Sequence, residues 1–559
     1  MRIISGSHLP DIVRGAVAPL WGPKTEAFDA LCSDGSWMTA KESMNQEMSK
    51  SLKTLLQNVE VLETHGDLEI PITGLSQDSR RVRAGDLFIA LHGSHHDGNL
   101  FIADAVGRGA RAILTENPMN NGLPENYVRV ADSRKAMTKI SANFFEHPAE
   151  RLQLLGITGT NGKTTTSLLI ESILKQDGGP VGVVGTLAYR WADKHEKAPM
   201  TTPDAIELNR LFQQMSRDGV KRVVMEVSSH ALSLGRVEGC RFTAAVFTNL
   251  SQDHLDFHKT MDDYFNAKAS LFKDYLHKIE SGAVAVVNRD DPYGMRLIES
   301  LGKNVWSYSV DHRDATVWTK RFECTTAGTK AEFVTPRGDV EVQSPLLGRL
   351  NLYNMLAAST TALALGISPA AVSAGLNSVI SIDGRLQRVP TPPQFDFEVV
   401  VDFAHTPDAM EKSLDCLKEM TKGRLLVVFG CGGDRDRGKR PIMGSVAAKI
   451  GDLVILTSDN PRSEVPSEII RDIEPGVQSM GLKQIDTNEL APSDKGYVVE
   501  EDRKKAIRLA LSWAAPGDVI FIGGKGHETY QIIGERVASF DDRVVVREYF
   551  ASLPTKSTN

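Results

Sequence analysis

With 559 residues the chain is too long for a single domain, and the usual domain size predicts three or four domains with cores of their own. Its 41% hydrophobic and 24% charged residues are typical of a soluble globular protein, and no apolar run approaches the roughly 18 residues of a membrane span. A net charge of -7 gives no support to nucleic-acid binding, and five cysteines without C-x-x-C spacing argue against structural zinc and favour the reducing cytoplasm.

The first part of the chain predicts an extension followed by a small domain. Residues 1–47 show no regular hydrophobic period and lack the features of a signal peptide, so we expect a poorly ordered N-terminal extension there. In residues 48–149 short apolar strands such as 86–91 alternate with turns. This pattern predicts a small α/β domain.

A nucleotide-phosphate cradle is the strongest motif of the chain. Residues 152–176 (LQLLGITGTNGKTTTSLLIESILKQ) predict an apolar strand, a glycine-rich turn and a helix that opens with Lys163. Backbone N–H groups and the positive helix end attract anionic oxygens, Lys163 adds a charge, and the Thr164 hydroxyl can ligate Mg²⁺. The alternative is a surface turn without a ligand. The expected ATP contacts in the turn are Gly159, Thr160, Asn161, Gly162, Lys163, Thr164 and Thr165.

The second domain, expected at 150–383, is predicted to be an ATPase core with a mainly parallel sheet. Apolar strands 181–185, 222–227 and 244–250 are separated by helical patterns. Glu226 stands at the carboxyl end of one of these strands, where open α/β sheets bind ligands, and His254 follows the next strand. Either side chain alone is more often structural, but beside the phosphate loop both are expected to bind metal.

Lys268 falls inside a helical apolar stripe that contains Phe265 and Phe272. One explanation is a snorkelling side chain whose ammonium reaches water. The other is a desolvated amine that reacts with CO₂, because burial favours the neutral form. The resulting carbamate would supply an anionic oxygen ligand to a second metal ion.

The third domain, expected at 384–559, is predicted to be Rossmann-like. Strands 397–403, 424–430, 452–457 and 518–523 alternate with helices, and each precedes a polar motif. Among these motifs GCGGDRDRGKRP resembles a dinucleotide fingerprint only superficially, since it lacks the G-x-G-x-x-G spacing. Its clustered arginines suit carboxylates or phosphates better.

Taken in order, GTNGKTT, MEVSSH, DHLDFH, AKASLF, DFAHTPD, GCGGDRDRGKRP, DNPR and GKGHE resemble the Mur ligases and, within them, the MurE group. The resemblance runs from about residue 52 to the last predicted strand. It implies three domains that hold a UDP-sugar, ATP and an incoming amino acid, the third of them mobile.

The resemblance also implies roles for individual residues. Lys163, Glu226, His254 and carbamylated Lys268 match catalytic positions, with Thr164, Glu226, His254 and Lys268 at two Mg²⁺ ions. Asn354, Asp402 and His405 match residues near the nucleotide. The implied substrate contacts are Ser79, Arg80 and the turn 95–98 for the uridine nucleotide; Thr201, Thr202, Ser228, Arg236 and Lys268 for the muramoyl-dipeptide; and Arg435, Asp459, Asn460, Pro461, Arg462, Gly524 and Glu528 for the amino acid.

The implied activity is an ADP-forming acid–amino-acid ligase of peptidoglycan precursor synthesis, and thus of cell-wall biogenesis, cell shape and cell division. It would join meso-diaminopimelate to UDP-N-acetylmuramoyl-L-alanyl-D-glutamate (UDP-MurNAc-L-Ala-D-Glu) through an acyl phosphate. We expect a cytoplasmic monomer that binds these small molecules and ATP, without nucleic acid or membrane insertion.

Three other functions are consistent with parts of this pattern. An L-lysine-adding MurE differs only in its amino acid, and Arg462 favours diaminopimelate because a guanidinium can pair with the additional carboxylate. Alternatively, Arg462 only caps its turn. A folylpolyglutamate synthetase-like ligase shares the phosphate loop but not the DSR-containing first domain. A non-catalytic nucleotide sensor would not need Lys163, Glu226, His254 and Lys268 together.

Overall fold

The computed structural model describes residues 49–93, 97–118, 125–277, 282–302, 304–486 and 495–553. The expected extension 1–47 and part of the turn 95–98 lie outside these ranges. The chain divides into two compact units. The first comprises Leu62–Arg129 and the chain up to Thr54, and the second comprises Leu55–Val61 and Val130–Asn559.

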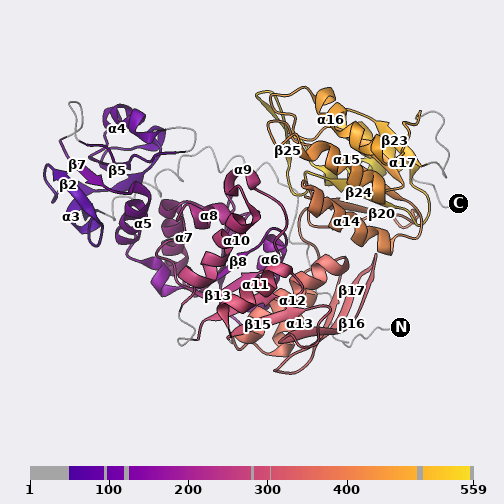
Figure 1. The fold of residues 1–559 in the computed structure, drawn as a ribbon, viewed down its shortest axis with the longest axis horizontal. Coiled ribbons are helices and arrows are strands. Elements are labelled where there is room, and N and C mark those ends of the chain that lie inside the picture. Colours follow the sequence, from indigo (N-terminus) through magenta and orange to yellow (C-terminus); the bar gives the residue numbers. More distant parts are fainter. Residues whose placement is uncertain are drawn as a thin grey trace, which may run out of the picture. The chain divides into compact units, whose positions relative to one another are not determined.

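The first unit, indigo to violet in Figure 1, is built on a five-stranded sheet with the order β2-β7-β6-β5-β4. Strands β4 to β7 pair in parallel. Their apolar residues, among them Phe88 and Ile113, pack with Ala105 of α4 in a small core. The elements are β1 (Lys50–Ser51), α3 (Leu52–Leu55), β2 (Val61–His65), β3 (Pro71–Ile72), β4 (Gly74–Ser76), β5 (Asp86–Ile89), α4 (Ile102–Gly107), β6 (Ala112–Thr115) and β7 (Tyr127–Val130).

The second unit contains an eleven-stranded sheet with the order β11-β10-β9-β12-β8-β13-β14-β15-β16-β17-β18. The central run β9-β12-β8-β13-β14-β15-β16 is parallel, and antiparallel strands extend the sheet at both edges. The central strands are β8 (Gln153–Thr158), β9 (Val181–Val184), β10 (Tyr189–Trp191), β11 (Lys194–Glu196), β12 (Arg222–Glu226), β13 (Phe242–Phe247), β14 (Val284–Asn288), β15 (Val305–Ser309), β16 (Val317–Thr325), β17 (Gly328–Val334) and β18 (Val340–Ser344).

Helices cover both faces of this sheet because residues along its inner strands are apolar on both sides. One core joins the sheet to α6, α12 and α13, and the other joins it to α7, α8 and α10. The helices are α5 (Ser133–Phe144), α6 (Lys163–Gln176), α7 (Ala205–Arg217), α8 (Ser229–Ser233), α9 (Leu255–His258), α10 (Met261–Ser270), α11 (Pro292–Leu301), α12 (Gly348–Ala364) and α13 (Pro369–Ser378).

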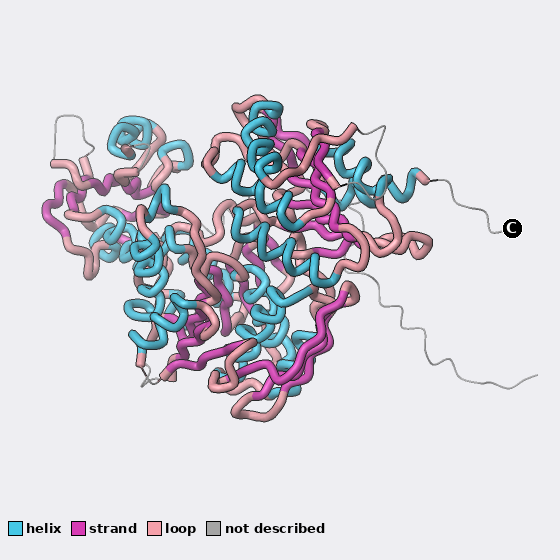
Figure 2. The backbone as a smooth tube through the Cα atoms, turned by 45° about the vertical axis from the view of Figure 1, so that its right-hand side comes forward, coloured by secondary structure: helices cyan, strands magenta, loops and turns pink. Residues whose placement is uncertain are grey.

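The C-terminal part forms a six-stranded sheet with the order β19-β20-β24-β21-β22-β23, parallel except for β19. Along its inner strands, side chains point alternately to a face covered by α14, α15 and α16 and to a face covered by α17 and α18. Figure 2 shows these strands (magenta) with helices (cyan) along them. The elements are β19 (Gln387–Val389), β20 (Glu398–Asp402), α14 (Pro407–Met420), β21 (Leu425–Phe429), α15 (Lys439–Ile450), β22 (Leu453–Leu456), α16 (Pro466–Ser479), β23 (Gly496–Val499), α17 (Arg503–Trp513), β24 (Val519–Gly523), β25 (Tyr530–Ile533), β26 (Arg536–Ser539) and α18 (Asp542–Ser552).

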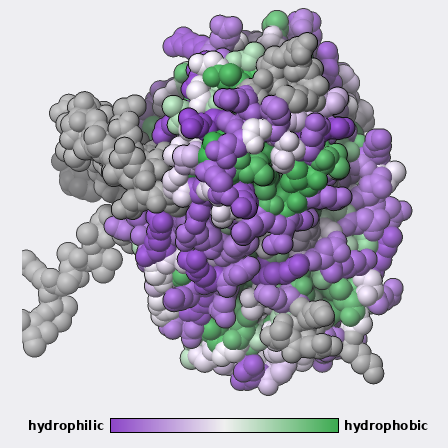
Figure 3. Space-filling model, turned by 90° about the vertical axis from the view of Figure 1, so that its left-hand side faces the viewer, coloured by the Kyte–Doolittle hydropathy of each residue, from purple (hydrophilic) through white to green (hydrophobic). Residues whose placement is uncertain are grey.

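The predicted α/β class with a mainly parallel central sheet is confirmed. The boundaries 149/150 and 383/384 stay predictions. Within the described ranges no helix is both long and apolar enough to cross a membrane. The face in Figure 3 is mostly hydrophilic, with separate hydrophobic patches.

Candidate active site

The phosphate loop connects β8 to α6 and depends on two glycines. Gly162 has φ +85°, a conformation that strains any residue with a Cβ, and a Cβ there would lie 2.4 Å from the Asn354 Oδ1. A Cβ at Gly159 would lie 1.9 Å from the Thr248 Oγ1. The extra glycine of the loop therefore allows the close approach of the strand end of β13.

Lys163 is the first residue of α6 and folds back over the loop. Its Nζ donates hydrogen bonds to the carbonyl oxygens of Gly159 and Thr160, both at 2.9 Å. Burial lowers the pKa of the Lys163 ammonium. Asn161 is held by its backbone N–H to the Asn249 Oδ1 at 2.9 Å. The Lys163 ammonium thus lies against the loop backbone, and Asn249 anchors the loop at Asn161.

Glu226 ends β12 beside this loop and is 1% exposed. Its Oε2 accepts hydrogen bonds from the hydroxyls of Thr164 and Thr186, each at 3.0 Å, and its Oε1 accepts one from the Thr186 N–H at 2.8 Å. A carboxylate and a hydroxyl in contact are the hard oxygen donors that suit Mg²⁺. Thr164 and Glu226 therefore fit the first expected metal ion.

His254 has a left-handed backbone with φ 53°, and its side chain is 45% exposed. Its ring meets the His230 ring edge-on, with centroids 4.8 Å apart. In the part of the chain that is described, no group of three or more His, Cys, Asp or Glu side chains could hold a metal ion.

Lys268 lies on α10 and is 1% exposed, so the expectation of a snorkelling ammonium in water is wrong. Its Nζ donates to the Gly159 carbonyl at 2.8 Å and lies 4.5 Å from the centre of the Tyr264 ring. Burial, and secondly the charge of Lys163, lower the Lys268 pKa well below its ordinary value. These surroundings favour the neutral amine that carbamate formation requires.

The residues expected at the muramoyl-dipeptide gather around Glu226. The Thr202 hydroxyl donates to the Glu226 carbonyl at 2.8 Å and accepts from the Ser228 N–H at 3.1 Å. Arg236 Nη1 donates to the Thr202 carbonyl at 2.9 Å. The Thr201 hydroxyl lies 3.0 Å from the Thr186 hydroxyl, which itself contacts Glu226.

The expected uridine residues belong to the first unit. Asp78 caps the short helix that holds Ser79 and Arg80, and its carboxylate accepts two hydrogen bonds from the Arg80 guanidinium at 2.9 Å. Ser79 is buried and the Arg80 side chain is 81% exposed. The Arg80 charge is thus fixed at the surface of the unit.

The expected nucleotide residues lie on three different segments of the second unit. The Asn354 Oδ1 accepts from the Thr166 hydroxyl of α6 at 3.3 Å. Asp402 is buried at the end of β20, accepts from the Leu386 and Ala404 N–H groups, and has its pKa raised by burial. The His405 Nδ1 lies 2.8 Å from the Phe403 carbonyl.

A cleft of about 1610 Å³ brings many of the expected residues together. His254 and His405 line it, and so do all the expected amino-acid contacts except Pro461. The Arg462 Nη1 donates to the Gly433 carbonyl at 2.8 Å and is 3.4 Å from the Asn460 carbonyl. The expected amino-acid contacts that line the cleft are Arg435, Asp459, Asn460, Arg462, Gly524 and Glu528.

Two residues with a clear place at the site were missed by the sequence reasoning. Arg385 follows the loop after α13 and stacks on the Phe403 ring at 4.8 Å. Its Nη2 is 3.4 Å from the Thr164 hydroxyl, while its buried Nε has no hydrogen-bond partner. Lys525 is completely buried next to Glu528. Lys525 could have been found from the sequence, because it is the basic residue of the motif GKGHE. Arg385 belongs to no periodic pattern, so no signal in the sequence indicated it.

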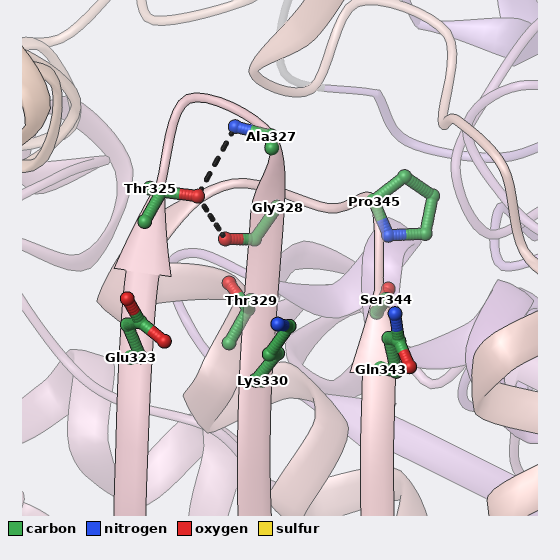
Figure 4. A pocket seen from close by; sticks show the side chains of 9 residues that line it. All are labelled: Glu323, Thr325, Ala327, Gly328, Thr329, Lys330, Gln343, Ser344 and Pro345. Carbon is green, nitrogen blue, oxygen red and sulfur yellow. Dashed lines mark hydrogen bonds between the residues drawn. The ribbon is translucent and has the colours of Figure 1, made fainter.

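A smaller hollow of about 450 Å³ lies on the antiparallel strands β16, β17 and β18. Figure 4 shows Thr325 at its rim, where the hydroxyl accepts from the Ala327 N–H and donates to the Gly328 carbonyl. None of its lining residues is an expected site residue. This hollow is therefore separate from the expected site residues.

A phosphate loop and a buried acid at adjacent strand ends, with a cleft toward a second α/β sheet, define a nucleotide-dependent enzyme. Three family models match the chain: the Mur ligase family catalytic domain at residues 71–145, the Mur ligase middle domain at 157–362, and the Mur ligase glutamate ligase domain at 384–526.

Individual relatives match over nearly the whole chain. The UDP-N-acetylmuramoyl-L-alanyl-D-glutamate--2,6-diaminopimelate ligase of Geobacter metallireducens is 44% identical over 90% of this chain and 99% of its own. The protein of the same name from Gloeobacter violaceus is 45% identical over 87% and 95%. A solved structure of a protein with that name has a TM-score of 0.63 at 33% identity and covers 90% of this chain and 99% of its own. The chain therefore belongs to the Mur ligase family, and it is an ATP-dependent ligase.

Proposed function

We propose that this ligase joins meso-diaminopimelate to UDP-N-acetylmuramoyl-L-alanyl-D-glutamate in peptidoglycan precursor synthesis, as a cytoplasmic monomer. The relatives' names supply the two substrates. One observation in the structure carries the proposal. The Glu226 carboxylate accepts from the Thr164 hydroxyl of the phosphate loop, and the Glu226 backbone carbonyl accepts from the Thr202 hydroxyl expected at the acceptor. An acceptor carboxylate held there would lie next to the terminal phosphate of ATP.

The reaction begins at the acceptor carboxylate, which is a poor electrophile. Its oxygen attacks the γ-phosphorus of ATP, and an acyl phosphate and ADP form. Lys163 neutralises charge on the phosphoryl oxygens as it develops, because its ammonium needs only to turn from the loop carbonyls toward them. When bound, Mg²⁺ held by Thr164 and Glu226 would supply further positive charge to these oxygens.

The second half of the reaction uses the large cleft. The neutral amine nitrogen of the amino acid attacks the acyl carbon, and the tetrahedral intermediate expels phosphate as the acyl C–O bond breaks. The nitrogen releases one proton to solvent as the amide forms. Arg462 and Glu528, which line the cleft, would bind the far end of the amino acid and orient the attacking amine. Exclusion of water from the cleft would protect the acyl phosphate from hydrolysis.

A phosphate-release assay with each co-substrate omitted in turn tests this function. We expect ATP turnover only when the UDP-linked acceptor and a diamino acid are both present, because the acyl phosphate requires a bound carboxylate. A folylpolyglutamate-type ligase would respond to a folate acceptor, and a nucleotide sensor would show no dependence on either co-substrate. Equal rates without the acceptor would refute the ligase reaction proposed.

A further inference from the structure

Lys525 is a buried basic residue that takes no part in the proposed reaction steps. It follows β24 and stands between Gly524 and Gly526, which have φ values of +107° and +53°. A Cβ at Gly526 would lie 2.6 Å from the Phe403 Cβ, so the chain is tightly packed here. This course directs the Lys525 side chain into the domain, where it is 0% exposed.

The ammonium of Lys525 completes a triangle with two residues that line the cleft. Its Nζ donates to the Asn460 Oδ1 and to the Glu528 Oε2, both at 3.1 Å. The Asn460 Nδ2 donates to the same Glu528 Oε2 at 2.8 Å. Lys525 itself does not line the cleft, so it can act on a bound molecule only through its two partners.

These contacts fix the orientation of both partners. The Asn460 Oδ1 accepts from Lys525 and from the Ile532 N–H at 3.0 Å, which leaves its amide N–H₂ to point at Glu528. Two donors on Oε2 likewise fix the rotation of the Glu528 carboxylate. In the described part of the chain, Lys525 is the cation that pairs directly with this carboxylate.

Without the ammonium, Glu528 would lose its ion pair with Lys525, and of the two donors on its Oε2 only the Asn460 amide would remain. The Glu528 side chain is only 17% exposed, so water can replace the lost partner only in part. A carboxylate held in one orientation can offer a protonated amine charge-assisted hydrogen bonds.

We infer that Lys525 is a positioning residue that holds the Glu528 carboxylate directed at the far amine of the incoming amino acid. This inference rests on the proposed function. Diaminopimelate and lysine both carry a far amine, whereas only diaminopimelate carries the carboxylate expected at Arg462. Lys525 therefore sets affinity for both amino acids alike and leaves the preference between them unchanged.

The test compares steady-state kinetics of the wild type with Lys525→Met, Lys525→Arg and Glu528→Gln. In Lys525→Met we expect the KM for diaminopimelate to rise about 30-fold, with the KM values for ATP and the acceptor changed less than about twofold. The ratio of kcat/KM for diaminopimelate over lysine should stay within about twofold of wild type, and Lys525→Arg should restore part of the affinity. Lys504→Met is the matched control, because it removes an exposed lysine of α17 that pairs with Glu548 of α18.

A double substitution keeps the inference testable if Lys525→Met fails to fold. The pair Lys525→Met with Glu528→Gln leaves no unpaired buried charge, and it should have the same KM for diaminopimelate as Glu528→Gln alone. Independent effects of the two substitutions, equal rises of all three KM values, or an unchanged KM for diaminopimelate in folded Lys525→Met would overturn the inference. A wild type that uses no diamino acid would instead refute the proposed function.

Discussion

Replacement of Arg462 should abolish the preference for diaminopimelate over lysine. The Arg462 Nη1 is occupied by the carbonyls of Gly433 and Asn460, and no carboxylate of the described chain lies within the 4.0 Å of an ion pair. The edge formed by Nε and Nη2 remains for the far carboxylate of diaminopimelate, which can accept two parallel charge-assisted hydrogen bonds. Lysine offers no group for this edge.

The size of the effect follows from these two bonds. A hydrogen bond to a charged group contributes about 1.5–3 kcal/mol, and part of this is offset by the water that each group gives up. A net discrimination of about 2–4 kcal/mol corresponds to a ratio of roughly 30 to 1,000 in kcat/KM. The alternative, that Arg462 only caps its turn through Nη1, predicts a loss of stability with an unchanged ratio.

The assay measures kcat/KM for meso-diaminopimelate and for L-lysine by phosphate release. Arg462→Ala should lower the first value by the full ratio and leave the second nearly unchanged. Arg462→Lys keeps the charge without the planar fork and should recover less than half of the lost free energy. A wild-type preference for lysine, or a ratio that survives in Arg462→Ala, would refute this reasoning.

Four further predictions concern the phosphate loop and its neighbours. Lys163→Ala should lower turnover about 100-fold or more with an unchanged melting temperature, and normal turnover would contradict its role in charge neutralisation. Active enzyme should give a carbamate signal from Lys268 in carbon-13 NMR with labelled bicarbonate, and full activity of Lys268→Ala would argue against that modification. Gly162→Ala should destabilise the fold by about 1–2 kcal/mol from backbone strain alone, as measured by urea denaturation, and adding Asn354→Ala should relieve only the steric part. Burial, and secondly the neighbouring His230, lower the pKa of His258 to about 4 from an ordinary 6.5, so the stability that its neutral form contributes is present above pH 6.5 and is lost as pH falls through 4. An identical pH dependence of unfolding in His258→Gln would contradict this.

The local structure at the phosphate loop could be predicted from the sequence alone. An apolar strand, a glycine-rich turn and a helix beginning at Lys163 follow from short-range periodicity and backbone freedom, and the structure has β8 and α6 in these places. The parallel strand ends that carry Glu226 and Asp402 could be predicted for the same reason. Residue order also indicated which motifs follow strands, because each motif interrupts an apolar run.

Contacts between segments far apart in the sequence were decided only by the tertiary structure. The sequence left the Lys268 ammonium either in water or buried, and packing of α10 against the phosphate loop buried it on the Gly159 carbonyl. Arg385 and Lys525 were not singled out, because a single basic residue has no period that reveals its partner. Their roles depend on Thr164 and Glu528, which reach them through the packing of separate elements. Local chain preferences set the elements, whereas the energy of a buried charge depends on which neighbours the whole fold brings to it.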